Sequence, residues 1–140
     1  MPFILVVASE GSCRRLYVDN LVMRGYVAVG TASTNEAHNL LQHSIPELII
    51  VCTVRSGYED AILDLHKMHS LANVPIILVS PDPPDPDWMK TWGVAGNLQY
   101  PIDLRKLLPY LRPWLKPLTD SNRGQLNTPV GAFEIQDLAA

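Results

Sequence analysis

The sequence is short of cysteine, of basic residues and of long apolar runs, and each shortage excludes a class of protein. Its two cysteines, Cys13 and Cys52, stand far apart and show no metal-binding spacing. The formal net charge of -3 gives no basic surface of the kind that nucleic acids require. No apolar stretch approaches the roughly 20 residues that span a bilayer. We therefore expect no direct binding to nucleic acid and no membrane contact.

Signatures of catalysis are also missing. The segment after the first apolar run, residues 9–12, contains a single glycine and cannot form a glycine-rich phosphate loop. The sequence shows no nucleophile–base pair and no cluster of metal ligands. We therefore expect this chain not to be an enzyme and to carry no cofactor.

The first apolar run, residues 3–8, is too short for the core of a signal peptide, and no basic segment precedes it. We interpret this run as a β-strand. Without a secretion signal, the simplest expectation is a cytoplasmic protein with reduced thiols.

What is present fits one folded domain. Hydrophobic residues make up 47% of the 140 residues and charged residues 18%. Strand-like and helix-like segments alternate five times, which predicts an α/β fold with a doubly wound, five-stranded parallel sheet of flavodoxin-like strand order 2-1-3-4-5. The expected strands are 3–8, 26–30, 47–52, 74–79 and 97–100, and the expected helices are 12–24, 33–43, 58–71, a short one before Gly93, and 103–115.

The domain is expected to occupy residues 1–115, and residues 116–140 form a C-terminal tail that serves as a linker or a docking segment. Three helix starts carry capping signals. Ser33 with Glu36 forms a capping box, Asp85 precedes Pro86, and Asp103 opens the last helix.

The first helix has apolar residues at Leu16, Leu21 and Met23 with charged residues between them. This mixture of apolar and charged residues is typical of a helix. Arg14 and Arg15 are then expected to form a solvated helix start.

The segment 46–52, Pro-Glu-Leu-Ile-Ile-Val-Cys, resembles the third strand of a response-regulator receiver domain of the chemotaxis-regulator type. Further features fall in the order and spacing of that family: 4–10, Gly25-Tyr26, Glu36-Ala37, Leu40-Leu41, Gly57, 74–80, 93–95 and Pro101. The resemblance implies a role in two-component signal transduction.

The resemblance fails at the positions where the family carries its chemistry. In that family the Cys52 position holds the aspartate that accepts a phosphoryl group, and a thiol cannot replace it. The two acidic residues that follow the first strand are Ala8 and Ser9 here, and Glu10 alone remains acidic. Mg²⁺ usually requires one or two carboxylates.

Three further family positions complete this degenerate phospho-site. Ser80 retains the hydroxyl that senses the phosphate, Tyr100 replaces the lysine before the proline, and Asn97 replaces the aromatic rotamer switch. The combined loss predicts a pseudo-receiver, a module that signals without phosphorylation through protein–protein contacts. The alternative is a small-molecule or redox sensor that uses the emptied pocket around Cys52, which otherwise is a small apolar plug.

The aromatic residues gather late in the sequence, at Trp88, Trp92, Tyr100, Tyr110 and Trp114. In receivers, the fourth helix, fifth strand and fifth helix form the usual surface for dimers and partners, and interfaces are rich in Trp and Tyr. These residues therefore predict either an interface with a protein partner or a homodimer, or ordinary core packing. His66 and His69 are expected to be solvent-side helix residues rather than metal ligands.

Overall fold

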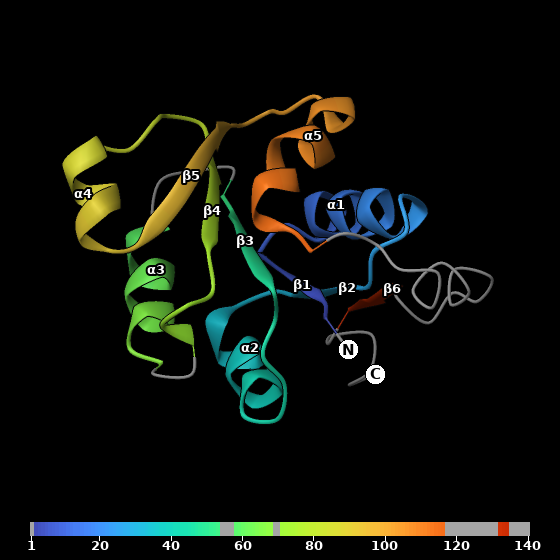
Figure 1. Ribbon diagram of the computed structural model, residues 1–140, viewed down its shortest axis with the longest axis horizontal. Helices are drawn as coiled ribbons and strands as arrows, with labels where there is room; N and C mark the ends of the chain where they lie inside the picture. The colour runs from blue at the N-terminus through green and yellow to red at the C-terminus, as the bar shows by residue number, and fades with distance from the viewer. Residues whose placement is uncertain (1, 54–57, 69–70, 117–131, 135–140) are drawn as a thin grey trace.

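The computed structural model describes residues 2–53, 58–68, 71–116 and 132–134 (Figure 1). Its strands are β1 (Ile4–Ala8), β2 (Ala28–Thr31), β3 (Leu48–Cys52), β4 (Ile76–Ser80), β5 (Val94–Gln99) and β6 (Ala132–Glu134). Its helices are α1 (Gly11–Met23), α2 (Thr34–Leu41), α3 (Tyr58–His66), α4 (Pro86–Thr91) and α5 (Leu107–Leu111). Within the described residues, no helix is long and apolar enough to cross a membrane.

The described strands form one parallel sheet in the order β5-β4-β3-β1-β2-β6. The predicted order 2-1-3-4-5 is therefore confirmed for the first five strands. The structure adds β6, which pairs with β2 so that Ala28 lies opposite Ala132 and Gly30 opposite Glu134. The five-stranded prediction did not include this sixth strand, which lies in the tail that was expected to be a linker or a docking segment.

Helices cover both faces of the sheet, as Figure 1 shows with α1 and α5 on one side and α2, α3 and α4 on the other. Alternate residues of β1 enter the two resulting cores. Ile4 and Val6 pack beneath α1 and α5, whereas Leu5 and Val7 pack beneath α2 and α3. A strand covered on both faces has no polar side to present, which explains why its sequence is a continuous apolar run.

The predicted helix caps are confirmed. The Ser33 hydroxyl accepts a hydrogen bond from the Glu36 N–H at 3.3 Å, and the Glu36 carboxylate accepts one from the Ala32 N–H at 2.8 Å. Asp85 accepts from the backbone N–H of Asp87, and Asp103 accepts from that of Arg105. These bonds satisfy N–H groups that have no partner inside the helix.

Of the three apolar residues that pointed to a helix here, Leu21 alone is buried in α1. Leu16 is 56% exposed and Met23 is 84% exposed, although Leu21 is fully buried. The stripe that faces the sheet is instead Cys13, Arg14, Tyr17, Val18 and Leu21. These positions recur at intervals of three and four residues, which places them on one side of a helix.

Arg14 is buried, with 3% of its surface exposed. The expectation that it belongs to a solvated helix start is therefore wrong. Its guanidinium donates a hydrogen bond to the Ala8 carbonyl at 2.6 Å. Its aliphatic stem lies against Gly30 of β2, where an added Cβ would come within 2.9 Å of Arg14 Cγ. A long side chain can thus cross the core because Gly30 leaves space for its stem.

The end of the domain departs from the predicted boundaries. β5 begins at Val94, three residues before the predicted start, because Val94 already pairs with Ile76 ahead of a register irregularity. The last helix is broken into 3-10 turns, Leu104–Lys106 and Arg112–Trp114, on either side of α5, as expected near Pro109 and Pro113. Gly57, His69 and most of the tail lie outside the described residues.

Candidate functional site at the carboxyl rim of the sheet

Ala8 and Cys52 lie side by side at the carboxyl end of the sheet. They are register partners at the ends of β1 and β3, and their exposed fractions are 2% and 3%. In open parallel sheets this rim is where ligands bind. Ala8 stands where the receiver family carries a metal-binding acid, and Cys52 stands where it carries the phosphoryl acceptor. The two replaced positions are therefore neighbours.

The neighbouring Ser9 and Glu10 are exposed. The Glu10 carboxylate accepts a hydrogen bond from the Ser12 hydroxyl at 2.9 Å. Among the residues that the structure describes, no group of three His, Cys, Asp or Glu side chains could hold a metal ion. Glu10 is therefore the carboxylate that the described segment after β1 offers, where Mg²⁺ coordination usually takes one or two beside a phosphate.

Ser80 and Asn97 are held by hydrogen bonds to the protein itself. The buried Ser80 hydroxyl donates to the Asp82 carbonyl at 2.7 Å. The Asn97 side-chain amide donates to the Leu78 carbonyl at 3.0 Å and approaches the Ser80 hydroxyl at 3.4 Å. The Ser80 hydroxyl therefore bonds to the backbone just after β4, and the Asn97 side chain is held by the backbone of β4.

Tyr100 stands at the position where the receiver family carries a lysine, and its side chain is half-buried. Its N–H donates to the Ser80 carbonyl at 2.7 Å, and a cis peptide bond joins it to Pro101. Its side chain helps to line a cavity of about 310 Å³ between the start of α1 and the segment that follows β5. The full lining is Glu10, Ser12, Cys13, Leu16, Tyr17, Tyr100, Pro101, Ile102 and Leu104.

The structure brings Cys13 to Cys52, a contact that the sequence analysis missed. Their sulfur atoms lie 3.2 Å apart, and the Cys52 thiol donates to the Tyr17 hydroxyl at 3.5 Å. The hydrogen bond with Cys52 lowers the pKa of the Cys13 thiol to about 7. The same hydrogen bond, together with burial, raises the pKa of Cys52. Burial, followed by the hydrogen bond with Cys52, raises the pKa of Tyr17.

The sequence held a signal for this contact. Cys52 ends a strand that was expected beside the first strand, and Cys13 stands in the first turn of the helix that follows that first strand. Both residues therefore belong at the same rim. What the sequence did not reveal was the rotation of α1, which turns Cys13 and Tyr17 toward the sheet and leaves Leu16 exposed.

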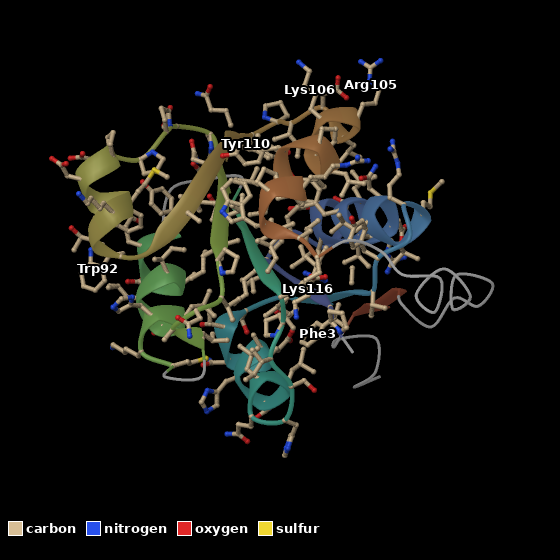
Figure 2. All side chains as sticks on the ribbon, viewed as in Figure 1. Phe3, Trp92, Arg105, Lys106, Tyr110 and Lys116 are labelled. Carbon is tan, nitrogen blue, oxygen red and sulfur yellow. The ribbon has the colours of Figure 1, made fainter. Side chains whose placement is uncertain are left out.

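The five aromatic residues proposed as an interface are all half-buried and lie on both sides of β5. Trp88 and Trp92 pack with the core beneath α2 and α3, whereas Tyr100, Tyr110 and Trp114 pack with the core beneath α1 and α5. Figure 2 shows Tyr110 beside the far end of β5 and Trp92 at the end of α4, close to where β5 begins. The aromatic residues thus flank one outer strand rather than form a continuous patch.

Each tryptophan has a ring partner within the domain. The Trp88 ring meets Tyr58 edge-on with ring centroids 5.3 Å apart, and Trp92 meets the exposed His66 at the same distance. Trp114 lies 5.5 Å from Tyr110. Part of each ring therefore serves internal packing, and the remainder is available at the surface.

Comparison with known proteins identifies the fold. No protein-family model and no curated protein sequence matches this chain. Among solved structures, a response regulator receiver domain protein of Methanospirillum hungatei superposes with a TM-score of 0.71 at 17% identity, covering 89% of this chain and 98% of its own.

Two further structures give the same result. The chemotaxis protein CheY4 of Vibrio cholerae has a TM-score of 0.68 at 24% identity, covering 82% of this chain and 99% of its own. A response regulator receiver modulated diguanylate cyclase of Pelobacter carbinolicus has a TM-score of 0.63 at 20% identity, covering 91% of this chain and 100% of its own. The chain therefore has the fold of a response-regulator receiver domain.

Proposed function

We propose that this domain is a pseudo-receiver, a signal-transduction module that acts by contact with a protein partner or a second copy and does not depend on phosphorylation. The observation that carries the proposal is the pairing of Ala8 with Cys52 at the rim of a receiver fold. The similar structures named above include a response regulator receiver domain protein and a chemotaxis protein, and their shared fold supports the signalling role.

The chemistry of the rim supports the loss of phosphorylation. An acyl phosphate forms on a carboxylate, and the side chain at the end of β3 is the Cys52 thiol. The Ser80 hydroxyl is already bonded to Asp82, and the Tyr100 position supplies no cation to a phosphoryl group. The two replaced positions, Cys52 and Tyr100, each lack a separate element of phosphoryl binding.

The half-buried aromatic residues around β5 support contact with a protein. Trp and Tyr contribute large apolar area at little cost in side-chain entropy, which is why interfaces are rich in them. We place the partner surface along α4, β5 and α5, with Trp88, Trp92, Tyr100, Tyr110 and Trp114 as its aromatic residues.

The test is titration with Mg²⁺ and beryllofluoride, which mimics an acyl phosphate. Tryptophan fluorescence and NMR amide spectra are recorded, and a phosphorylatable receiver in the same buffer is the positive control. We expect no saturable change in this chain. Saturable shifts centred on Ser80 and Cys52 would restore a phosphoryl switch and overturn the proposal.

A second candidate function is small-molecule sensing, favoured by the cavity of about 310 Å³ beside Tyr100. This volume lies at the lower end of the range of ligand pockets. Cys52 does not belong to its lining, so the site differs from the emptied pocket expected around that residue. Fragment screening by NMR tests this function: saturable shifts at Cys13 and Tyr100 that Leu16→Trp abolishes would support it, and their absence would refute it.

A further inference from the structure

Two thiols meet beneath the rim, and their contact is independent of whether the domain is phosphorylated. Cys13 stands in the first turn of α1, Cys52 is the last residue of β3, and their sulfur atoms are 3.2 Å apart. We propose that Cys13 and Cys52 form an intramolecular disulfide when a hydroperoxide reaches Cys13 through the cavity beside Tyr100. The domain would then carry a reversible oxidation site in addition to its partner surface.

The cavity determines which thiol reacts first. Cys13 belongs to its lining, whereas Cys52 does not and has 3% of its surface exposed. A hydroperoxide is small enough for a space of about 310 Å³. Cys13 is therefore the thiol that meets the oxidant, and Cys52 is the thiol that resolves the product.

The ionisation of the two thiols supports the same order. Because Cys52 shares its hydrogen bond with Cys13, the pKa of Cys13 falls to about 7 while that of Cys52 rises. At neutral pH, a substantial fraction of Cys13 is then thiolate, the form that attacks peroxides. Cys52 keeps its proton and can donate it to the Cys13 thiolate across the 3.2 Å between the two sulfur atoms.

The reaction has two steps. The Cys13 thiolate attacks the hydroperoxide, an S–O bond forms, the O–O bond breaks, and the departing alkoxide takes up a proton to become an alcohol, or water if the oxidant is hydrogen peroxide. Cys52 then loses its proton and attacks the Cys13 sulfur, an S–S bond forms, the S–O bond breaks, and hydroxide leaves with that proton as water. Two thiols lose two electrons, and one hydroperoxide is reduced.

Little movement is needed for the second step. A disulfide bond is about 2.05 Å long, so sulfur atoms at 3.2 Å must approach by roughly 1.2 Å. Both residues lie at element ends, where α1 begins and β3 stops. The bond would tie that helix start to the end of the neighbouring strand, and we expect the oxidised domain to unfold at a higher temperature than the reduced one.

The experiment uses the full chain. Reduced protein is treated with hydrogen peroxide, quenched with N-ethylmaleimide and weighed by intact mass spectrometry. We expect a monomer lighter by two hydrogens that takes up no maleimide and is restored by dithiothreitol. Because the chain has two cysteines, this product must contain the Cys13–Cys52 bond. Protein that still takes up two maleimides, or that gives sulfinic acid or disulfide-linked dimers instead, would overturn the proposal.

Two variants test the order of reaction. In Cys52→Ala, we expect peroxide to leave Cys13 as a sulfenic acid that dimedone traps. In Cys13→Ala, we expect Cys52 to remain unmodified over the same time. Trapping of Cys52 rather than Cys13 would refute the assigned roles. The wild-type chain in urea serves as a comparison without mutation, and internal disulfide formation as fast there as in the folded state would show that the fold does not position the pair.

Discussion

Cys13, Cys52 and Tyr17 form one hydrogen-bonded group, and its members influence one another's ionisation. The pKa of Cys13 is lowered, and those of Cys52 and Tyr17 are raised. Negative charge at this point in the core is therefore concentrated on the thiol that borders the cavity. Burial favours this division, because Cys13 lines the cavity whereas Cys52 has 3% of its surface exposed.

The pH dependence of Cys13 alkylation tests this arrangement. Thiolate is the reactive form, so the rate should rise with pH and reach half of its maximum near the pKa of about 7. Cys52→Ala removes the largest cause of the lowered pKa and should move the midpoint to higher pH. The rate is followed with iodoacetamide and site-resolved mass spectrometry. A wild-type midpoint equal to that of the variant would contradict the assigned hydrogen bond.

At this scale, the sequence predicted positions better than contacts. The resemblance to receiver domains placed Ala8, Cys52 and Ser80 at strand ends, and in the structure these residues end adjacent strands. It did not predict that Cys13 and Tyr17 would fill the space beneath them. The positions of strand ends can be predicted from the order of segments along the chain. The packing of Cys13 and Tyr17 depends on the rotation of α1 about its axis, which that order does not determine.

Among the elements, β5 is the outermost strand on its side of the described sheet, and Tyr110 protects it. The Tyr110 hydroxyl accepts from the Asn97 N–H at 2.9 Å and donates to the Asn97 carbonyl at 3.1 Å. Outer strands expose such groups to pairing with other chains. A phenol from α5 thus takes the place that a further strand would occupy.

Tyr110→Phe should destabilise the domain by about 1–3 kcal/mol, because it leaves a partly buried N–H and carbonyl without their partner. Urea unfolding followed by tryptophan fluorescence measures the change. The matched control is Tyr58→Phe, which removes a hydroxyl that no described residue contacts by a hydrogen bond and keeps the ring against Trp88. Equal stabilities of the two variants would show that the hydroxyl bridge to Asn97 contributes nothing.

The elements also show where sequence patterns succeed. The apolar runs of β1, β3 and β4 identified strands buried on both faces, and each is fully buried in the structure. The pattern of α1 was ambiguous because apolar residues lie on two of its sides. Leu16 and Met23 compete with Val18 and Leu21, and a buried arginine cannot be anticipated without its glycine neighbour on β2.

For the whole molecule, the proposed partner surface predicts self-association or partner binding that depends on the β5 side. Ala95 is exposed on β5, so Ala95→Arg should block a packed interface without disturbing the core. Sedimentation over a range of concentrations measures the mass. If wild-type protein dimerises, this variant should stay monomeric, whereas Asn39→Arg on the exposed side of α2 should not. Dimers of unchanged stability in Ala95→Arg would remove β5 from the interface.

The proposed domain boundary predicts that a chain ending at Lys116 folds. Among the side chains that the structure describes, the two cores are built from β1 to β5 and the five helices, so we expect them to persist when β6 is removed. We expect cooperative unfolding to persist, and hydrogen exchange to become faster at the β2 amides that pair with β6. A truncated chain without a cooperative transition would show that the tail belongs to the folded unit.

The short strand β6 and the phenol of Tyr110 together affect how copies of this domain can pair through the outer strands of the sheet. In the part of the sheet that the structure describes, one outer strand is three residues long, and on the other the backbone N–H and carbonyl of Asn97 are bonded to Tyr110. Both features reduce the backbone that copies could use to polymerise. Recognition must rest on side chains at the surface, which mutation can exchange one at a time while the buried sheet stays the same. Such a molecule can acquire or lose partners without risking its fold.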